Sequence, residues 1–144
     1  MKNQNITKTH FGIYGINIKD NKILLIKKTR GPYTGLYDLP GGSPETNEVP
    51  EETLIREIKE ETNLDVTSFN FYKKTSIIFS NFTPQSNQTG VLEHTALLYH
   101  IQTSGMLSQD GDGIDSGGAV WVNINELNEK NATPYAIIGA KSKL

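Results

Sequence analysis

Apolar residues in the first part of the chain fall into two short runs. Residues 10–18 (HFGIYGINI) and 22–28 (KILLIKK) are rich in β-branched and aromatic side chains, and the turn formers Asp20 and Asn21 separate them. Each run predicts a β-strand. Residues 29–44 contain many Gly and Pro residues, which is typical of a loop.

A helical periodicity replaces this pattern over residues 50–62. Pro50 suits the first helical position, because the backbone N–H that proline lacks would have no acceptor within the helix there. Asn63 suits the left-handed residue that ends a helix. The later pattern predicts strands near 66–79 and 91–102, a short strand at 119–122, and short helices at 124–130 and 134–141. Strands with a few helices indicate an α+β fold.

The predicted helix has an apolar side and an acidic edge. At about 100° per residue, Leu54, Ile55, Ile58 and Thr62 fall within one arc of about 100°, which we expect to face the core. Beside this arc lie three carboxylates at i, i+3 and i+4 spacing, namely Glu57, Glu60 and Glu61.

Like charges at this spacing repel each other by a few tenths of a kcal/mol. Two interpretations are open. The acids form an ordinary solvated face that Arg56 and Lys59 partly neutralise, or they bind a divalent cation, since Mg²⁺ prefers carboxylate oxygens.

Composition limits the other possibilities. The length of 144 residues suits a single domain over residues 1–144. The absence of cysteine excludes disulfides and thiolate metal sites. A net charge of −2 argues against binding to a nucleic acid polymer. The longest aliphatic run is residues 23–26, and the N-terminal residues lack the apolar segment of a signal peptide. We therefore expect a soluble, cytoplasmic protein that does not contact membranes.

The spacing from Gly42 onward resembles the Nudix box, G-x5-E-x7-R-E-U-x-E-E-x-G-U, where U is aliphatic. Five residues separate Gly42 from Glu48, and seven more lead to the run REIKEE at 56–61. The single departure is Asn63 in place of the final Gly, and Asn is the usual substitute at such a helix end.

The flanks resemble the MutT-like members of this family. Residues 30–42 approach R-x-x-x-x-G-x-W-x-x-P-G-G, with Tyr37 near the aromatic position, and WVNINEL at 121–127 resembles W-x-x-x-x-E-L. The resemblance implies a mixed β-sheet sandwiched between α-helices. It also implies hydrolysis of a nucleoside diphosphate linked to another group, X, with Mg²⁺ or Mn²⁺ as cofactor.

The resemblance also assigns roles to residues. Glu57, Glu60 and Glu61 correspond to the metal-binding carboxylates, the Gly41 carbonyl to a further ligand, and Glu48 to a member of the surrounding acidic shell. A glutamate accepting a proton from water acts as general base. That role falls to Glu60 or Glu61, and Arg56 holds a box glutamate in orientation.

Substrate contacts are expected from Arg30 and Gly42, with Lys27 and Lys28 as weaker candidates. Members of the family often recruit one more acid from a later loop, and here the candidates are Asp110, Asp112, Asp115 and Glu93, with Asp115 preferred.

Other signals are set aside. Residues 110–121 fail the EF-hand pattern because Gly is missing at position six and Glu at position twelve. His10, His94 and His100 form no H-E-x-x-H motif and are interpreted as ordinary strand or surface residues, and Trp121 as a core residue.

The alternative to an enzyme is a Nudix domain that senses nucleotides without cleaving them. The intact carboxylates favour the enzyme. Its expected partner is a small nucleoside diphosphate derivative, with a nucleoside triphosphate or a nucleotide sugar favoured, and the resemblance is compatible with a homodimer.

Overall fold

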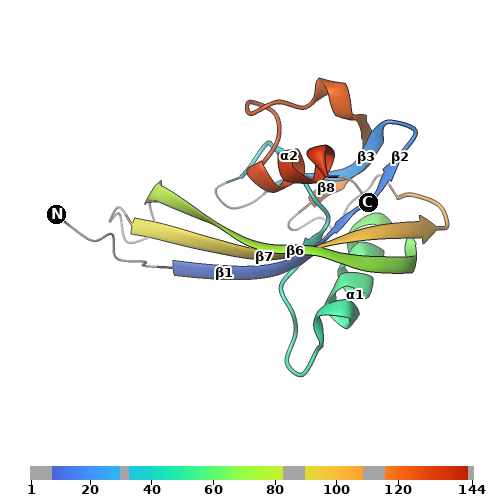
Figure 1. Cartoon of the computed structure of the whole chain (residues 1–144), viewed down its shortest axis with the longest axis horizontal. Helices are drawn as coiled ribbons and strands as arrows, with labels where there is room; N and C mark the ends of the chain where they lie inside the picture. The colour runs from blue at the N-terminus through green and yellow to red at the C-terminus, as the bar shows by residue number, and fades with distance from the viewer. Residues whose placement is uncertain (1–7, 30–32, 83–89, 109–115, 143–144) are drawn as a thin grey trace.

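A computed structural model describes residues 8–29, 33–82, 90–108 and 116–142, which form two sheets and two α-helices (Figure 1). The strands are β1 (Lys8–Ile16), β2 (Ile18–Lys19), β3 (Lys22–Lys28), β4 (Tyr37–Asp38), β5 (Gly41–Gly42), β6 (Asp65–Phe82), β7 (Gly90–Ser104) and β8 (Ser116–Asn123). The helices are α1 (Pro50–Thr62), α2 (Pro134–Lys141) and a 3-10 turn, η1 (Ile124–Glu126).

The first sheet has the strand order β5-β1-β7-β6 and is mixed. Strands β1 and β7 run parallel, with Ile13 opposite Leu97, whereas β5 pairs with β1 and β6 pairs with β7 in the antiparallel sense. In the second sheet β3 pairs with β2, β4 and β8, all antiparallel.

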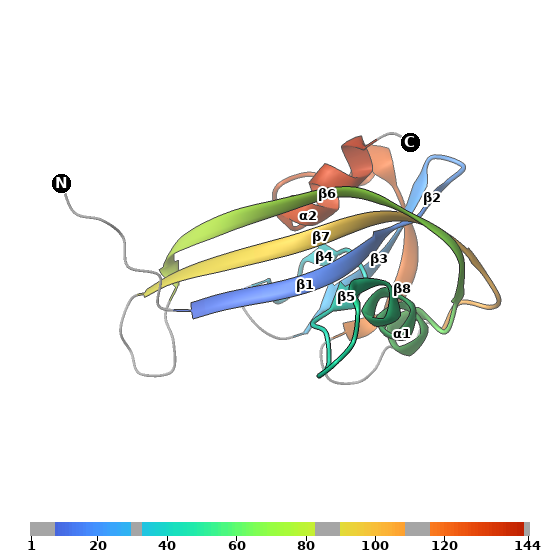
Figure 2. The ribbon, with the colours of Figure 1, turned by 60° about the horizontal axis from the view of Figure 1, so that its bottom comes forward.

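The two α-helices lie on opposite sides of the first sheet (Figure 2). On one side Leu54 and Ile58 of α1 pack with Ile13 and Tyr99 in one apolar cluster. On the other side Tyr135 of α2 belongs to a second cluster, with Tyr14, Ile16 and Leu98 among its other members. This layering confirms the expected α+β sandwich.

Several local predictions are confirmed. The predicted elements at 22–28, 50–62 and 134–141 coincide with β3, α1 and α2. Asp20 and Asn21 have φ of 53° and 62°, as a tight hairpin turn requires. Asn63 ends α1 with φ of 67°, and its N–H donates to the Lys59 carbonyl at 2.9 Å.

Two element predictions are wrong. The expected helix at 124–130 stops at Glu126, because Asn128 Oδ1 accepts the Lys130 N–H at 2.8 Å and the Asn131 amide donates to the Glu126 carbonyl. Such side-chain bonds compete with helical ones. The loop predicted at 29–44 also contains β4 and β5.

The core face of α1 is rotated from the predicted arc. Leu54, Ile58 and Thr62 are buried as expected, but Ile55 is 43% exposed. Thr53 and Glu61 are buried in its place. The acidic edge of the helix is therefore turned toward the protein, where it meets β5. Neither described α-helix is long and apolar enough to cross a membrane.

Candidate functional site

The glycine pair of β5, Gly41–Gly42, lies against α1, and a side chain at either position would meet neighbouring atoms. Gly41 has φ of 150°, and a Cβ there would lie 2.1 Å from the Ile13 carbonyl oxygen. A Cβ on Gly42 would lie 2.6 Å from the carboxyl carbon of Glu57. Gly41 is therefore required by the close approach of β5 to β1, whereas the missing side chain of Gly42 leaves the space that the end of the Glu57 side chain fills.

Glu61 is fixed by the backbone of the same strand. Its Oε1 accepts the Gly41 N–H at 2.8 Å, and the side chain is only 3% exposed. A buried carboxylate needs such partners because its desolvation is unfavourable. The carboxylates of Glu57 and Glu61, one helical turn apart, therefore both lie against the glycine pair.

Arg56 forms hydrogen bonds with three other glutamates of the box, Glu48, Glu57 and Glu60. Its Nε and Nη2 donate to Glu48 at 2.6 and 2.9 Å, and its Nη1 donates to Glu57 at 2.8 Å and to Glu60 at 3.3 Å. A bidentate arginine–carboxylate pair of this kind fixes both distance and orientation. The predicted positioning role of Arg56 thus has a concrete set of partners in this structure.

Sequence reasoning missed three further contacts in this network. Glu45 forms an ion pair with Arg56 at 3.2 Å, the Ser43 carbonyl accepts from the same guanidinium, and the Thr53 hydroxyl donates to Glu48 at 2.7 Å. The bonds from Arg56, followed by the Glu45 N–H, lower the pKa of Glu48 to about 2. Glu48 is therefore a carboxylate throughout the neutral range.

Glu60 differs from the other box glutamates because its side chain is 53% exposed. Its described partner is Arg56, four residues earlier on the helix. An exposed carboxylate beside buried ones has the access to solvent that a proton acceptor needs.

The box glutamates are suitable ligands for a hard divalent cation, since Mg²⁺ prefers carboxylate and carbonyl oxygens. Across the described ranges, no group of three or more His, Asp or Glu side chains already converges as a metal site. Arg56 pairs with Glu48, Glu57 and Glu60 instead. The carboxylates beside Gly42 fit a cation if Arg56 gives up some of its contacts with Glu48, Glu57 and Glu60.

Arg30 and Asp115, with Asp110 and Asp112, lie outside the described residues. Glu93 is in β7, in register with Thr9 of β1 and Ile78 of β6, and none of the described contacts joins it to the box acids. Lys27 lies over the Tyr37 ring at 5.0 Å.

A buried network of hydroxyl and imidazole groups lies on the other face of the first sheet. Tyr14 OH is 2.9 Å from His94 Nε2, and Tyr33 OH is 3.3 Å from His94 Nδ1. Neutral imidazole has one donor and one acceptor nitrogen, so one hydroxyl donates and the other accepts. Burial, with His10 and Lys28 nearby, lowers the pKa of His94 to about 3.

This network adjoins the acidic site through Tyr14. Gly41 lies opposite Tyr14 in the β1–β5 register. Burial, reinforced by the charges of Asp38 and Glu61, raises the pKa of Tyr14 well above its usual range. His94 was expected to be an ordinary strand or surface residue. The sequence carried no signal for this role, because the register that places His10 beside His94 is set by the pairing of β1 with β7 in the structure.

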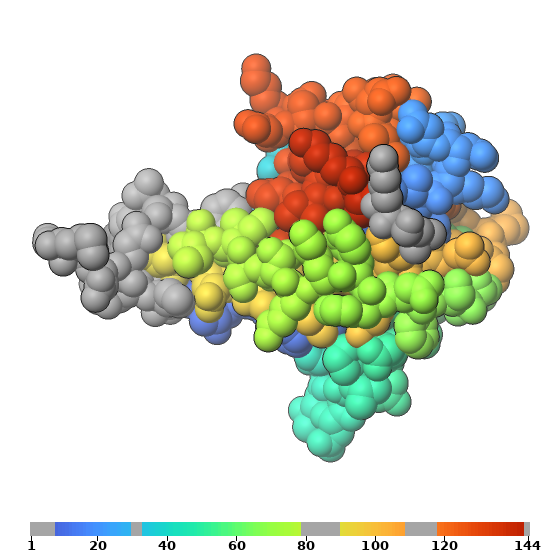
Figure 3. All heavy atoms as spheres, viewed as in Figure 1, coloured from blue at the N-terminus to red at the C-terminus, as the bar shows by residue number. Residues whose placement is uncertain are grey.

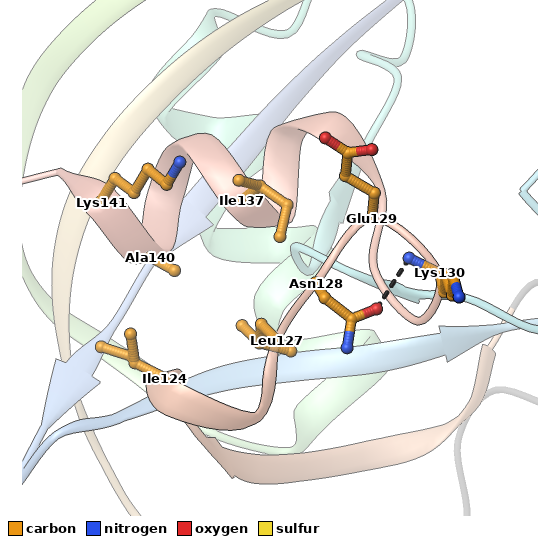
Figure 4. Close-up of a pocket in the computed structure, with 8 residues that line it drawn as sticks. All are labelled: Ile124, Leu127, Asn128, Glu129, Lys130, Ile137, Ala140 and Lys141. Carbon is orange, nitrogen blue, oxygen red and sulfur yellow. Dashed lines mark hydrogen bonds between the residues drawn. The ribbon is translucent and has the colours of Figure 1, made fainter.

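A pocket of about 590 Å³ lies elsewhere, between η1 and α2 (Figure 4). Its apolar wall contains Ile124, Leu127, Ile137 and Ala140, and Lys130 and Lys141 are at its rim. None of the predicted site residues lines it, so it is separate from the acidic site.

Comparisons with known proteins agree with this architecture. A family model described as NUDIX domain matches residues 7–139. The MutT NUDIX hydrolase from Burkholderia pseudomallei superposes with a TM-score of 0.70 at 21% identity, covering 94% of this chain and 98% of that one. A MutT protein from Bacillus halodurans gives the same TM-score and identity, covering 92% and 80%. At this identity the structures show the fold alone.

Sequence relatives are similar over shorter stretches. An ADP-ribose pyrophosphatase of Methanocaldococcus jannaschii is 58% identical over 50 residues, which is 35% of this chain and 30% of that protein. An 8-oxo-dGTP diphosphatase of Proteus vulgaris is 36% identical over 61 residues, 42% of this chain and 54% of that protein. A MutT-like protein of Streptomyces ambofaciens is 28% identical and covers 83% of this chain and 66% of its own length.

The chain thus spans from about a third to two thirds of the length of these relatives. The family match, in contrast, extends over nearly the whole chain and includes the glycine pair, the acidic helix and both sheets. The chain therefore belongs to the Nudix family.

Proposed function

We propose that this chain hydrolyses a phosphoanhydride bond in a nucleoside diphosphate linked to a group X, with Mg²⁺ or Mn²⁺ as cofactor. The observation that carries the proposal is the placement of the Glu57 and Glu61 carboxylates against the glycine pair Gly41–Gly42. A solvated acidic face does not require a buried carboxylate held by a backbone N–H.

Glu57, Glu60 and Glu61 are the proposed ligands, with the Gly41 carbonyl and Glu48 completing the site. When bound, the cation polarises phosphoryl oxygens and lowers the pKa of a coordinated water.

The side chains have separate tasks in this proposal. Glu61 is held in place by the Gly41 N–H, and Glu60, the most exposed of the box acids, accepts the proton of the attacking water. Arg56 positions Glu48 and Glu57. The missing side chain of Gly42 leaves room for the Glu57 carboxylate. Gly42, Arg30 and Asp115 are assigned to substrate contact on the sequence alone.

The proposed substrate is a small molecule, either a nucleoside triphosphate or a nucleotide sugar. Relatives named 8-oxo-dGTP diphosphatase and ADP-ribose pyrophosphatase support these two classes. We further propose that residues 1–144 act as a single domain, because the family match and the structural neighbours extend over nearly all of it.

The test is a screen for released phosphate, pyrophosphate and nucleotide over nucleoside triphosphates, nucleotide sugars, ADP-ribose and dinucleoside polyphosphates, with Mg²⁺ and with Mn²⁺. Wild type is compared with Glu57→Gln, Glu60→Gln and Glu61→Gln. Glu129→Gln is the matched control because Glu129 lines the separate pocket.

We expect Glu60→Gln to lower kcat by ~10²–10⁴-fold, as loss of a general base does. Glu57→Gln and Glu61→Gln should weaken Mn²⁺ binding, measured by calorimetry, by at least ~10-fold. Tight nucleotide binding by wild type without turnover of any substrate would overturn the proposal in favour of a sensor domain.

A further inference from the structure

The apolar stripe of α1 has an acid on each of its edges. At about 100° per residue, Leu54 and Ile58 lie between Glu51 on one edge and Glu61 on the other, within an arc of about 80°. Glu61 belongs to the last turn and is bonded to β5. Glu51 belongs to the first turn, and its Oε2 accepts a hydrogen bond from the hydroxyl of Tyr99 in β7. The two ends of the helix are therefore bonded to two different strands.

These two strands lie on either side of β1 in the first sheet. Gly41 of β5 is in register with Tyr14 of β1, and Tyr99 of β7 is in register with the next residue of β1, Gly15. The two anchoring points are therefore about 10 Å apart across the sheet, which is two strand spacings. The two glutamates are about 15 Å apart along the helix axis. The helix thus crosses β1 with one hydrogen-bonded anchor on each side of it.

The apolar contact under the middle of the helix does not by itself fix the crossing angle. Here α1 lies over Gly15, where a Cβ would be 3.2 Å from Ile58 Cδ1. Burial of apolar surface is non-directional, whereas the strength of a hydrogen bond depends on its direction. The teal atoms of α1 and of the loop before it project from the molecule in Figure 3. We therefore expect the hydrogen bonds at the two ends to set the angle.

The two ends are not anchored equally. At the C-terminal end, the Ser108 N–H donates to the Thr62 carbonyl at 2.9 Å, and the Asn63 amide donates to the Met106 carbonyl at 3.1 Å. In the first turn, Tyr99 provides the side-chain hydrogen bond to the sheet. The other described side-chain bonds of this turn stay within the helix and the loop before it. Loss of the Tyr99 bond would therefore free one end of α1 while the other end remains held.

Tyr99 is itself held firmly. Its side chain is 5% exposed, and the rings of Phe69 and Phe71 pack edge-on against it, with centroids 6.0 and 5.5 Å away. Burial, followed by the hydrogen bond with Glu51, raises the pKa of Tyr99 to about 12. The hydroxyl therefore remains a proton donor throughout the neutral range.

We propose that Tyr99 and Glu51 are positioning residues for the acidic site. Their hydrogen bond sets the angle of α1 on the sheet, and this angle sets the distance of the Glu57 carboxylate from Gly42. Without the bond, the helix pivots about its held C-terminal end, and Glu57 moves further than Glu61 because it is further from the pivot. The inference rests on the proposed function, since the site that the bond positions is the proposed metal site.

The test is Tyr99→Phe, which keeps the ring and removes the hydroxyl. The angle of α1 is measured without metal, from the residual dipolar couplings of its amides relative to those of the sheet. We expect the couplings of α1 to change and those of β1 and β7 to stay the same. The Mn²⁺ Kd, measured by calorimetry, should rise by at least ~3-fold. Tyr72→Phe is the matched control, because Tyr72 packs on the other face of the same sheet.

Variants of the acceptor separate positioning from general stability. Glu51→Ala should reproduce Tyr99→Phe, and the double variant should be no worse than either single one, because both remove the same bond. Glu51→Gln retains an acceptor oxygen and should keep the Mn²⁺ Kd within ~2-fold of wild type. A lower melting temperature of Tyr99→Phe with unchanged α1 couplings would overturn the proposal, since the bond would then only stabilise the fold. Altered couplings with an unchanged Mn²⁺ Kd would also overturn it.

Failure of the proposed function gives a different result. A wild-type chain that binds Mn²⁺ and cleaves no substrate would contradict hydrolysis, while the couplings and the Mn²⁺ Kd would still test the role of Tyr99. A wild-type chain that binds no Mn²⁺ would contradict the metal site, and the positioning of that site would be overturned with it.

Discussion

Arg56 donates to both carboxylate oxygens of Glu48, at 2.6 and 2.9 Å, across eight residues of chain. The same guanidinium donates to Glu57 at 2.8 Å. One cation therefore joins the loop before α1 to the acidic edge of the helix. Its removal changes both the shape of the loop and the charge balance among the glutamates.

Arg56→Lys should therefore destabilise the fold. Lysine carries one ammonium group and cannot make the bidentate contact, so Glu48 and Glu57 lose a shared partner. We expect a loss of about 2 kcal/mol in the free energy of unfolding, typical of hydrogen bonds to charged groups. Urea unfolding measures it. Lys59→Arg, at an exposed position on the same helix, is the control, and equal stability of wild type and Arg56→Lys would contradict the prediction.

Glu48 should make the free energy of unfolding fall as the pH is lowered into the acid range. Its pKa in the folded state, about 2, is below its unfolded value near 4.5, so its contribution is present above pH 4.5 and is lost as pH falls through about 2. The melting temperature of Glu48→Gln should be below that of wild type at pH 6, and the gap should narrow toward pH 2. A gap that stays constant over this range would be evidence against the pairing.

Gly42→Ala should impair the metal site with little effect on the fold. The new Cβ would lie 2.6 Å from the carboxyl carbon of Glu57, and the flexible end of that side chain can move away. We expect weaker Mn²⁺ binding, by ~10-fold or more, with a nearly unchanged melting temperature. Ser43→Ala is the neighbouring control, because the described contact of Ser43 with Arg56 uses its backbone carbonyl. Unaltered Mn²⁺ affinity in Gly42→Ala would refute the prediction.

Asp38 should make the protein less stable as pH rises. Burial raises its pKa to about 6, although Thr133 and the Leu39 N–H both donate to it. The folded pKa is above the unfolded value of 3.8, so this contribution is present below pH 3.8 and is lost as pH rises through about 6, in total roughly 3 kcal/mol.

Asp38→Asn tests this dependence. Both donors bind the same oxygen, Oδ1, which an asparagine retains. The variant should gain stability relative to wild type between pH 4 and pH 8, as measured by urea unfolding. Parallel stability curves for the two proteins would show that Asp38 has an ordinary pKa.

His94, in contrast to Asp38, should make the protein less stable as the pH falls. Burial lowers its pKa to about 3, below the ordinary value of 6.5, so the folded state resists protonation and stability is lost as pH falls from 6.5 toward 3. NMR titration should find the His94 imidazole neutral at pH 5. His94→Gln should flatten the acid limb of the stability curve. A His94 signal that titrates near pH 6.5 would contradict the prediction.

Local signals in the sequence determined a large part of this structure. Pro50 and Asn63 mark the ends of α1 because capping depends on the few residues around each terminus. The spacing of the box glutamates placed three carboxylates on one helix edge, and the resemblance it carries gave the family. The run at 22–28 became β3 because its apolar residues are buried on both faces.

Only the tertiary structure decided which surfaces are covered. Periodicity shows which residues share a face, but the covering partner comes from distant parts of the chain. Ile55 is exposed and Glu61 buried because β5, twenty residues before Glu61, packs on the acidic edge of α1. His94 is buried because Tyr14 and Tyr33 converge on it.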